Sequence, residues 1–242
     1  MESTVAICKE VLKRLVALGY ESESVVSSSP LIFPSKHGDK RISEQELRQL
    51  FIAVLNDNHK NLYYAIETPT VYSYSFTNDL KEIKIGDKEN KGQSALIDLC
   101  LFKKEDEQSK YKRLLNIEFK YKNATETNFS KDILKLMHEA ENGAFVLLLK
   151  NTDGGTLTNA GETGVIDKLV GSIKHHDKSK VWNGGDTKFF ELVILSLEEK
   201  VNGKPFVMHR KISFSELGNL DGVLKKWVKE EWRVKDFKCI DK

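Results

Sequence analysis

The chain has 242 residues, of which 40% are hydrophobic and 31% charged, a composition typical of an ordinary globular protein. Its formal net charge is only +2, so the overall charge does not indicate a broad polyanion-binding surface. No uninterrupted apolar run approaches the ~20 residues of a membrane-spanning helix. Charged residues between Glu2 and Lys13 interrupt any signal-peptide core. The sequence therefore predicts a cytoplasmic protein that does not bind a membrane.

The cysteines exclude two kinds of structural cross-link. Cys8, Cys100 and Cys239 are odd in number and far apart, and no CxxC or CxxH spacing occurs. A disulfide framework and a structural zinc site both need closer or paired spacings. We expect three reduced thiols.

The first half of the chain predicts two helices and three strands. Apolar spacing indicates a helix over residues 4–18, within an N-terminal segment 1–20. A second helix begins at Ser43, because Ser43 and Glu46 have the spacing of a capping box. Its expected buried residues are Leu47, Leu50, Phe51, Val54 and Leu55. Strands are expected over 62–70 with an extension to 74, over 94–102 and over 113–121.

The remaining elements complete an α/β pattern. A helix over 128–141 precedes an apolar run at 144–149, which has no alternation and suits a strand covered on both faces. Then follow a Gly/Thr-rich loop at 151–164, a helix at 165–175, strands at 189–197 and 206–214, and a closing helix at 220–232. We predict a single domain over 1–242, with a core at 43–150 and C-terminal additions at 151–242.

Charged residues inside two of the predicted strands mark the candidate site. Asp98 stands alone in an apolar run, and Glu118 and Lys120 interrupt the next strand. Burying a charge is costly unless it is paired or bound to a cation. Side chains alternate along a strand, so Glu118 and Lys120 share a face. A hairpin centred near Gln108 would place Asp98 opposite Glu118, with their Cβ atoms ~5 Å apart.

Two carboxylates at that separation repel each other unless a cation lies between them. Carboxylate oxygens with open water positions suit Mg²⁺ or Mn²⁺. Such an ion can bind a phosphate oxygen and lower the pKa of a bound water. Lys120 could orient that water or stabilise charge in the transition state. On the second helix, Glu44 projects toward the buried side and is expected to reach the site, whereas Glu46 is assigned to capping.

Asp98, followed about twenty residues later by Glu118-Phe119-Lys120, resembles the D…(D/E)-x-K signature of the PD-(D/E)XK nuclease superfamily. The order helix–strand–strand–strand–helix–strand over 43–150 also resembles that superfamily's restriction-endonuclease-like core, a mixed central β-sheet flanked by helices. Ile97 stands where the signature has proline.

The resemblance implies a magnesium-dependent nuclease acting on nucleic acid, with DNA as the expected substrate, in defence or repair. It assigns metal binding to Asp98 and Glu118, assistance of the nucleophilic water to Lys120, and an added acid to Glu44. It also implies that a homodimer is one form to expect.

Several alternatives remain open at this stage. Lys120 could simply pair with Asp98 or Glu118 at a sheet edge. The fold could instead serve as a catalytically inactive module that binds nucleic acid or protein. Lys122, Lys131 and Lys135 either contact phosphates or form a solvated helix face. His175 and His176 are expected to be a surface pair, because adjacent helical residues point about 100° apart.

Overall fold

The computed structural model describes residues 4–20, 35–36, 39–40, 42–76, 83–86, 94–176, 181–219 and 227–231. In chain order, the elements are α1 (Thr4–Tyr20), β1 (Ser35–Lys36), β2 (Asp39–Lys40), α2 (Glu44–Asn58), β3 (Tyr63–Phe76), β4 (Ile83–Gly86), β5 (Ser94–Lys103), β6 (Lys112–Tyr121), α3 (Glu126–His138), β7 (Asn142–Leu149), α4 (Gly154–Leu157), α5 (Val165–His175), β8 (Phe189–Ser196), β9 (Phe206–Ser213), the 3₁₀ helix η1 (Phe214–Asn219) and β10 (Val228–Glu231). None of the helices in these ranges has the length and apolarity needed to cross a membrane.

A mixed eight-stranded sheet organises the described part of the chain, in the order β10-β9-β8-β7-β6-β5-β3-β4. Strands β6, β7 and β8 run parallel to one another, and the other neighbours are antiparallel. The predicted α/β class, with a mixed sheet flanked by helices, is therefore confirmed. Strands β8 to β10 continue the same sheet beyond β7, so the segment after residue 150 widens the sheet.

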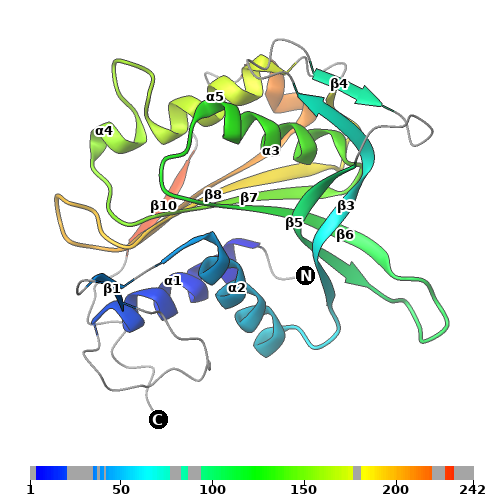
Figure 1. The fold of residues 1–242 in the computed structure, drawn as a ribbon, viewed down its shortest axis with the longest axis horizontal. Coiled ribbons are helices and arrows are strands. Elements are labelled where there is room, and N and C mark those ends of the chain that lie inside the picture. The colour runs from blue at the N-terminus through cyan, green and yellow to red at the C-terminus, as the bar shows by residue number, and fades with distance from the viewer. Residues whose placement is uncertain are drawn as a thin grey trace.

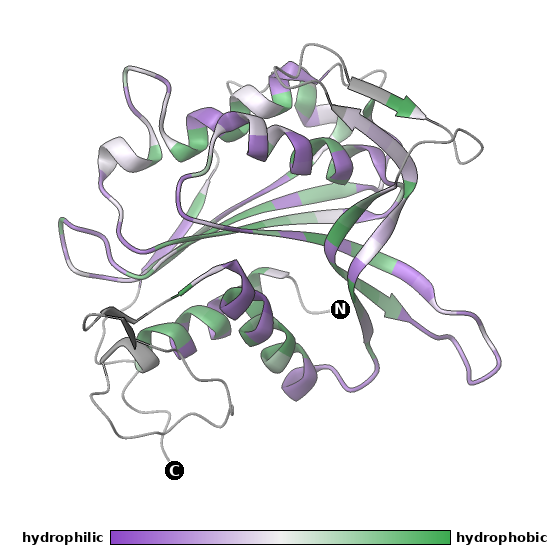
Figure 2. Cartoon of the chain, viewed as in Figure 1, coloured by the Kyte–Doolittle hydropathy of each residue, from purple (hydrophilic) through white to green (hydrophobic). Residues whose placement is uncertain are grey.

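Helices cover the sheet on both faces. Figure 1 shows α1 and α2 on one side and α3 and α5 on the other. Strand β7 lies between these layers and is buried on both sides, as its unbroken apolar run predicts. Val146 and Leu148 join the core beneath α1 and α2, whereas Phe145 and Leu147 join the core beneath α3 and α5. In Figure 2 hydrophobic and hydrophilic residues alternate along α1 and α2, and the outer end of the β5–β6 hairpin is hydrophilic.

Helix α2 begins where the sequence predicts. Ser43 is its N-cap, and the Ser43 hydroxyl oxygen accepts a hydrogen bond from the Gln45 backbone N–H at 3.3 Å. The same hydroxyl donates to the Glu46 carboxylate, so Glu46 supports the cap. All five residues expected on its buried side are buried. Phe51 packs edge-on against Phe119 of β6, with ring centroids 5.3 Å apart, which holds the middle of α2 against the end of β6.

The end of the chain departs from the prediction. Residues 228–231 form strand β10, antiparallel to β9, where the sequence pattern predicts a helix; residues 220–226 and 232 of that helix lie outside the described residues. The predicted loop at 151–164 also contains the short helix α4, capped by Asp153. Helix-like apolar spacing did not anticipate β10, because pairing with β9 supplies backbone hydrogen bonds that local periodicity does not report.

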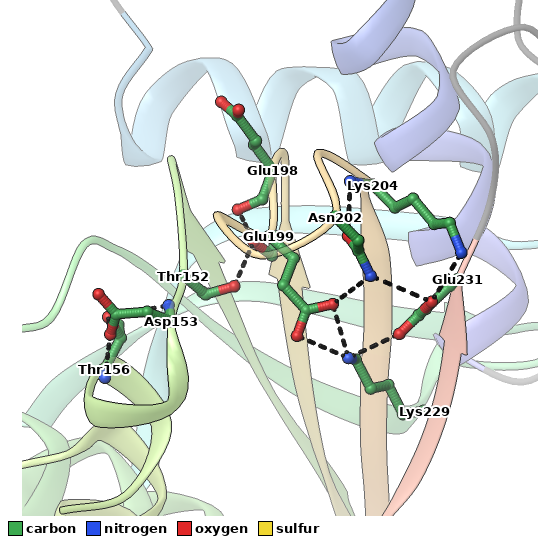
Figure 3. A network of polar contacts seen from close by, with 10 residues as sticks. Thr152, Asp153, Thr156, Glu198, Glu199, Asn202, Lys204, Lys229 and Glu231 are labelled. Carbon is green, nitrogen blue, oxygen red and sulfur yellow. Dashed lines mark hydrogen bonds and ion pairs between the residues drawn. The ribbon is translucent and has the colours of Figure 1, made fainter.

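Polar contacts join β10 to the turns at its end of the sheet (Figure 3). The Lys229 ammonium lies 2.9 Å from a Glu199 carboxylate oxygen and 2.7 Å from Glu231. Asn202 donates to Glu199 at 2.9 Å, and Thr152 donates through its backbone N–H to the Glu198 carbonyl at 2.8 Å. These contacts link the loops after β7 and β8 to the edge strand.

Buried Glu139 joins the end of α3 to a bulge in β3. Its carboxylate accepts hydrogen bonds from the backbone N–H groups of Val71 at 2.9 Å and Tyr72 at 3.3 Å, and from the Tyr74 hydroxyl at 3.0 Å. Arg113 of β6 lies 3.6 Å from the same carboxylate. The pairing of β3 with β5 shifts register in this region, between Pro69 and Ser73. Glu139 therefore fixes α3 over strands β3 and β6.

His176 joins α5 to α3 and is buried, so the predicted surface pair with His175 is wrong for His176. Its Nε2 lies 2.9 Å from the Ser130 carbonyl oxygen and 3.0 Å from the Ser130 hydroxyl. Within the described part of the chain, its buried Nδ1 has no hydrogen-bond partner. Burial is the main reason that the pKa of His176 falls to about 4, with a smaller contribution from His175, against the opposing hydrogen bond to Ser130.

The first prediction concerns Glu139. Glu139→Ala should lower the free energy of unfolding by about 3 to 5 kcal/mol, because it leaves Arg113 and three hydrogen-bond donors without their buried acceptor. Urea unfolding followed by circular dichroism measures the change. Glu107→Ala, at an exposed position in the β5–β6 turn, is the matched control and should change stability by less than about 0.5 kcal/mol. A Glu139 variant as stable as this control would show that the contacts are dispensable.

The second prediction concerns pH. The folded state prefers neutral His176, so its contribution is complete above the unfolded pKa near 6.5 and is lost as pH falls toward 4. The loss should be on the order of 3 kcal/mol. His176→Gln cannot be protonated and should show a smaller drop in unfolding free energy between pH 7 and pH 4.5. The neighbouring variant His175→Gln should keep most of the pH-dependent loss, because His175 makes only a small contribution to the lowered pKa of His176; equal profiles for all three proteins would contradict the assignment.

Candidate active site

The pairing of β5 with β6 brings the two strand acids together. Leu99 pairs with Ile117 and Leu101 with Leu115, which is the register predicted for a hairpin centred near Gln108, although it shifts between Leu101 and Phe102. The recorded pairing ends at Leu99–Ile117, and Asp98 and Glu118 are the next residue on each strand. Leu99 and Ile117 point into the core beneath α1 and α2. Because side chains alternate, Glu118 points to the opposite face, toward α3.

Asp98 also contacts the β6 backbone directly. Its carboxylate oxygen Oδ2 accepts a hydrogen bond from the backbone N–H of Phe119 at 2.8 Å. A side-chain carboxylate thus satisfies the N–H of a strand residue that lies two positions past Ile117, the last paired residue of β6. This bond fixes one oxygen of Asp98 against β6 and holds the carboxylate beside Glu118.

Glu118 is buried under α3 and is neutralised from that helix. Only 1% of Glu118 is exposed. Its Oε1 lies 2.5 Å from the ammonium nitrogen of Lys135, which also lies 2.9 Å from Asp132 Oδ1. The solvated helix face considered for Lys135 is therefore wrong: Lys135 is buried and faces the sheet.

Lys120 lies on the same side of β6 and pairs with two other acids. Its Nζ is 2.9 Å from Asp132 Oδ2 and 3.7 Å from Glu44 Oε2. It also donates to the Phe119 carbonyl oxygen at 3.1 Å. Lys120 therefore does not form the simple ion pair with Asp98 or Glu118 that the sequence allowed. It pairs instead with Asp132 on α3 and with Glu44 on α2, two helices on opposite faces of the sheet.

Glu44 enters the cluster from the first turn of α2. It is half-exposed, and its carboxylate lies beside Lys120 at 3.7 Å. Burial raises the pKa of Glu44, Asp98 and Asp132 raise it further, and Lys120 opposes the shift. Glu44 therefore lies within the electrostatic reach of Asp98, as its position on the buried side of the helix predicts.

Two members of the cluster were missed as site residues in the sequence. The sequence pattern predicts no role for Asp132, and for Lys135 it predicts a phosphate contact or a solvated helix face. A signal was present for Asp132: it lies three residues after Phe129 and four before Leu136, both fully buried. An acid at that spacing falls on the apolar face of the helix, where burial requires a charged partner.

The cluster holds more carboxylates than ammonium groups. Glu44, Asp98, Glu118 and Asp132 face Lys120 and Lys135, which leaves a surplus of two negative charges when all are ionised. Burial, and then Asp132, raises the pKa of Glu118 well above its usual value, with Lys135 opposing. Burial alone would lower the pKa of Lys120, but the surrounding acids outweigh it and raise that pKa.

The donor set suits a hard divalent cation, with limits set by the geometry. Mg²⁺ is often held by one or two carboxylates, with water and phosphate oxygens completing its shell. Asp98 and Glu118 supply two such groups, and the charge surplus favours a cation. Among the residues that the structure describes, no group of three or more His, Cys, Asp or Glu side chains is arranged to hold a metal. Asp98 and Glu118 are thus the two carboxylates that could hold such an ion.

Asp132 holds both lysines, which gives a third prediction. Asp132→Asn should lower the free energy of unfolding by about 2 to 4 kcal/mol, because Lys120 and Lys135 lose a shared buried counter-charge. The change is measurable by chemical denaturation at pH 7. Asp186→Asn, an exposed carboxylate outside the cluster, should leave stability within about 0.5 kcal/mol of wild type. A neutral Asp132 variant would mean that the two lysines do not depend on this acid.

No protein-family model matches the chain, and no curated protein and no solved structure matches it.

Proposed function

We propose that the chain is a magnesium- or manganese-dependent nuclease that hydrolyses phosphodiester bonds in nucleic acid, with DNA as the expected substrate. The observation that carries the proposal is that Asp98 and Glu118 directly follow the last β5–β6 pair, and that Asp98 accepts a hydrogen bond from the backbone next to Glu118, inside a cluster with surplus negative charge. Neighbouring carboxylates of this kind suit a divalent ion and a phosphate-bearing substrate.

The arrangement of elements gives further support. Along the chain, the core elements follow in the order helix–strand–strand–strand–helix–strand, which are α2, β3, β5, β6, α3 and β7. The short strand β4 is inserted between β3 and β5. That order is the one expected of a restriction-endonuclease-like core, and the candidate residues lie on β5, β6 and the flanking helices.

Asp98 and Glu118 would hold the metal ion. When bound, the ion would lower the pKa of a coordinated water and offset charge on the phosphate. The Phe119 N–H bond to Asp98 Oδ2 orients that carboxylate in advance. Lys120 is held between Asp132 and Glu44, from where its ammonium would stabilise charge on the attacked phosphate or position the water. Glu44 would act through Lys120, as a positioning residue.

A second candidate function has its own supporting observation. Lys135 already neutralises buried Glu118 at 2.5 Å, and Lys120 contacts Asp132 rather than the two strand acids. Glu118 and Asp132 thus have cationic partners without a metal, which favours a non-catalytic module that binds nucleic acid or protein. The two functions differ in one measurable respect, because only the nuclease requires a divalent cation for its action.

The fourth prediction tests catalysis. The purified protein should cut plasmid or single-stranded DNA with Mg²⁺ or Mn²⁺ present, and EDTA should abolish cutting. Asp98→Asn and Glu118→Gln should each reduce the cleavage rate about 100-fold or more, since metal stabilisation of the transition state is worth several kcal/mol. These isosteric changes keep the volume of each side chain and so limit damage to the fold.

The control for cleavage is Glu107→Ala, in the exposed β5–β6 turn, which should cut at the wild-type rate. Circular dichroism should show that each variant is folded. Cation-independent cutting, or full activity in both site variants, would reject the proposed site. Absence of cutting for DNA and RNA alike, with tight binding retained, would favour the non-catalytic module.

A further inference from the structure

Lys135 is bound in the way that a metal ion would be bound. Its ammonium lies 2.5 Å from Glu118 Oε1, 2.9 Å from Asp132 Oδ1 and 2.9 Å from the Leu96 carbonyl oxygen, to which it donates. An ammonium has three hydrogen-bond donors and no acceptor, so these three oxygens use its full capacity. The side chain is 9% exposed. Lys135 is therefore a buried cation with a complete set of oxygen partners.

Two of these three oxygens belong to carboxylates that point at the same spot. Mg²⁺ binds oxygen at 2.0–2.1 Å and tolerates little departure from its preferred geometry. An ion on the Glu118 carboxylate would thus lie almost in contact with the Lys135 ammonium in its present position. Two cations so close repel each other strongly, and the repulsion is greater in a site shielded from water.

We propose that Lys135 is a built-in competitor for the metal: a divalent ion binds Glu118 only when the ammonium leaves it, so Lys135 sets the metal affinity of the site. This inference rests on the proposed function, since it assigns Glu118 as a metal ligand. It adds a role for α3, whose position determines whether Glu118 is held by a lysine or is open to an ion.

The electrostatics of the cluster agree with this exchange. Glu118 and Asp132 both lie within 2.9 Å of the Lys135 ammonium, so this one cation offsets two buried carboxylates. Removing that charge leaves Glu118 and Asp132 facing each other without a cation. The neutral variant should therefore take up a divalent ion more readily and depend on it more for stability.

The fifth prediction measures this competition without relying on catalysis. Mn²⁺ binding to the full-length protein is measured by calorimetric titration, for wild type and for Lys135→Met, a side chain of similar length and no charge. Mn²⁺ affinity should rise tenfold or more in Lys135→Met. Saturating Mn²⁺ should also raise the melting temperature of this variant more than that of wild type. Lys131→Met, one helical turn away on α3, is the control and should bind Mn²⁺ as wild type does.

Lys135→Gln serves if the methionine variant does not fold, because its amide can still donate to the Leu96 carbonyl oxygen; the same rise in affinity is expected. Wild-type protein that binds Mn²⁺, with equal or weaker binding in both Lys135 variants, would overturn the competition but leave the nuclease proposal intact. If neither wild type nor the variants bind Mn²⁺, both proposals fail. Mn²⁺ binding in the Lys135 variants but not in wild type would support the competition, and would show that Lys135 prevents the wild-type protein from binding Mn²⁺.

Discussion

The candidate site is built on a single electrostatic constraint, which is that a carboxylate buried between a sheet and a helix must have a positive partner. Glu118 is fully enclosed by β6 and α3, and Lys135 supplies the partner from the helix. Lys135 in turn needs Asp132, and Asp132 also holds Lys120. One buried acid thus accounts for a chain of charges that reaches Glu44 on the other side of the sheet. Removing Lys135 leaves buried Glu118 without its cationic contact, and removing Asp132 takes a counter-charge from both lysines, so these charges depend on one another.

The fold brings these charges together through its connections. Strands β6 and β7 are parallel, so the chain must cross over between them, and α3 is that crossover. The helix therefore lies against the strand that carries Glu118 and Lys120. At its far end Glu139 bonds to the β3 bulge and to Arg113, which restrains the helix along its length. On the opposite face, packing of Phe51 on Phe119 holds α2 against β6, and Glu44 lies in the first turn of that helix, just after the Ser43 cap.

The same geometry connects stability with the proposed chemistry. A site that is stable without metal needs its own cations, and Lys135 and Lys120 provide them. A site that acts on phosphates needs those acids available to a divalent ion. Of the two strand acids, Glu118 contacts a lysine, whereas Asp98 accepts a hydrogen bond from a backbone N–H. The negative charge of Asp98 is therefore the less compensated of the two. The balance between lysine and metal at Glu118 thus decides between a metal site and a purely structural ion network.

Much of the architecture could be read from the sequence, because it depends on local patterns. Apolar spacing located α1, α2 and α5, the uninterrupted apolar run located β7, and the acids within apolar strands indicated which positions carry the chemistry. The hairpin register that puts Asp98 and Glu118 next to the Leu99–Ile117 pair followed from counting residues between the strands. The edge strand β10 was missed because its partner, β9, supplies the hydrogen bonds that local propensity does not report. The pairing of Lys135 with Glu118 was missed because it joins a helix to a strand, and only the packing of α3 on the sheet determines which charges meet. The sequence alone thus determined which side chains are costly to bury, and the tertiary structure decided which partner each of them has, because pairing depends on distances between segments that are far apart along the chain.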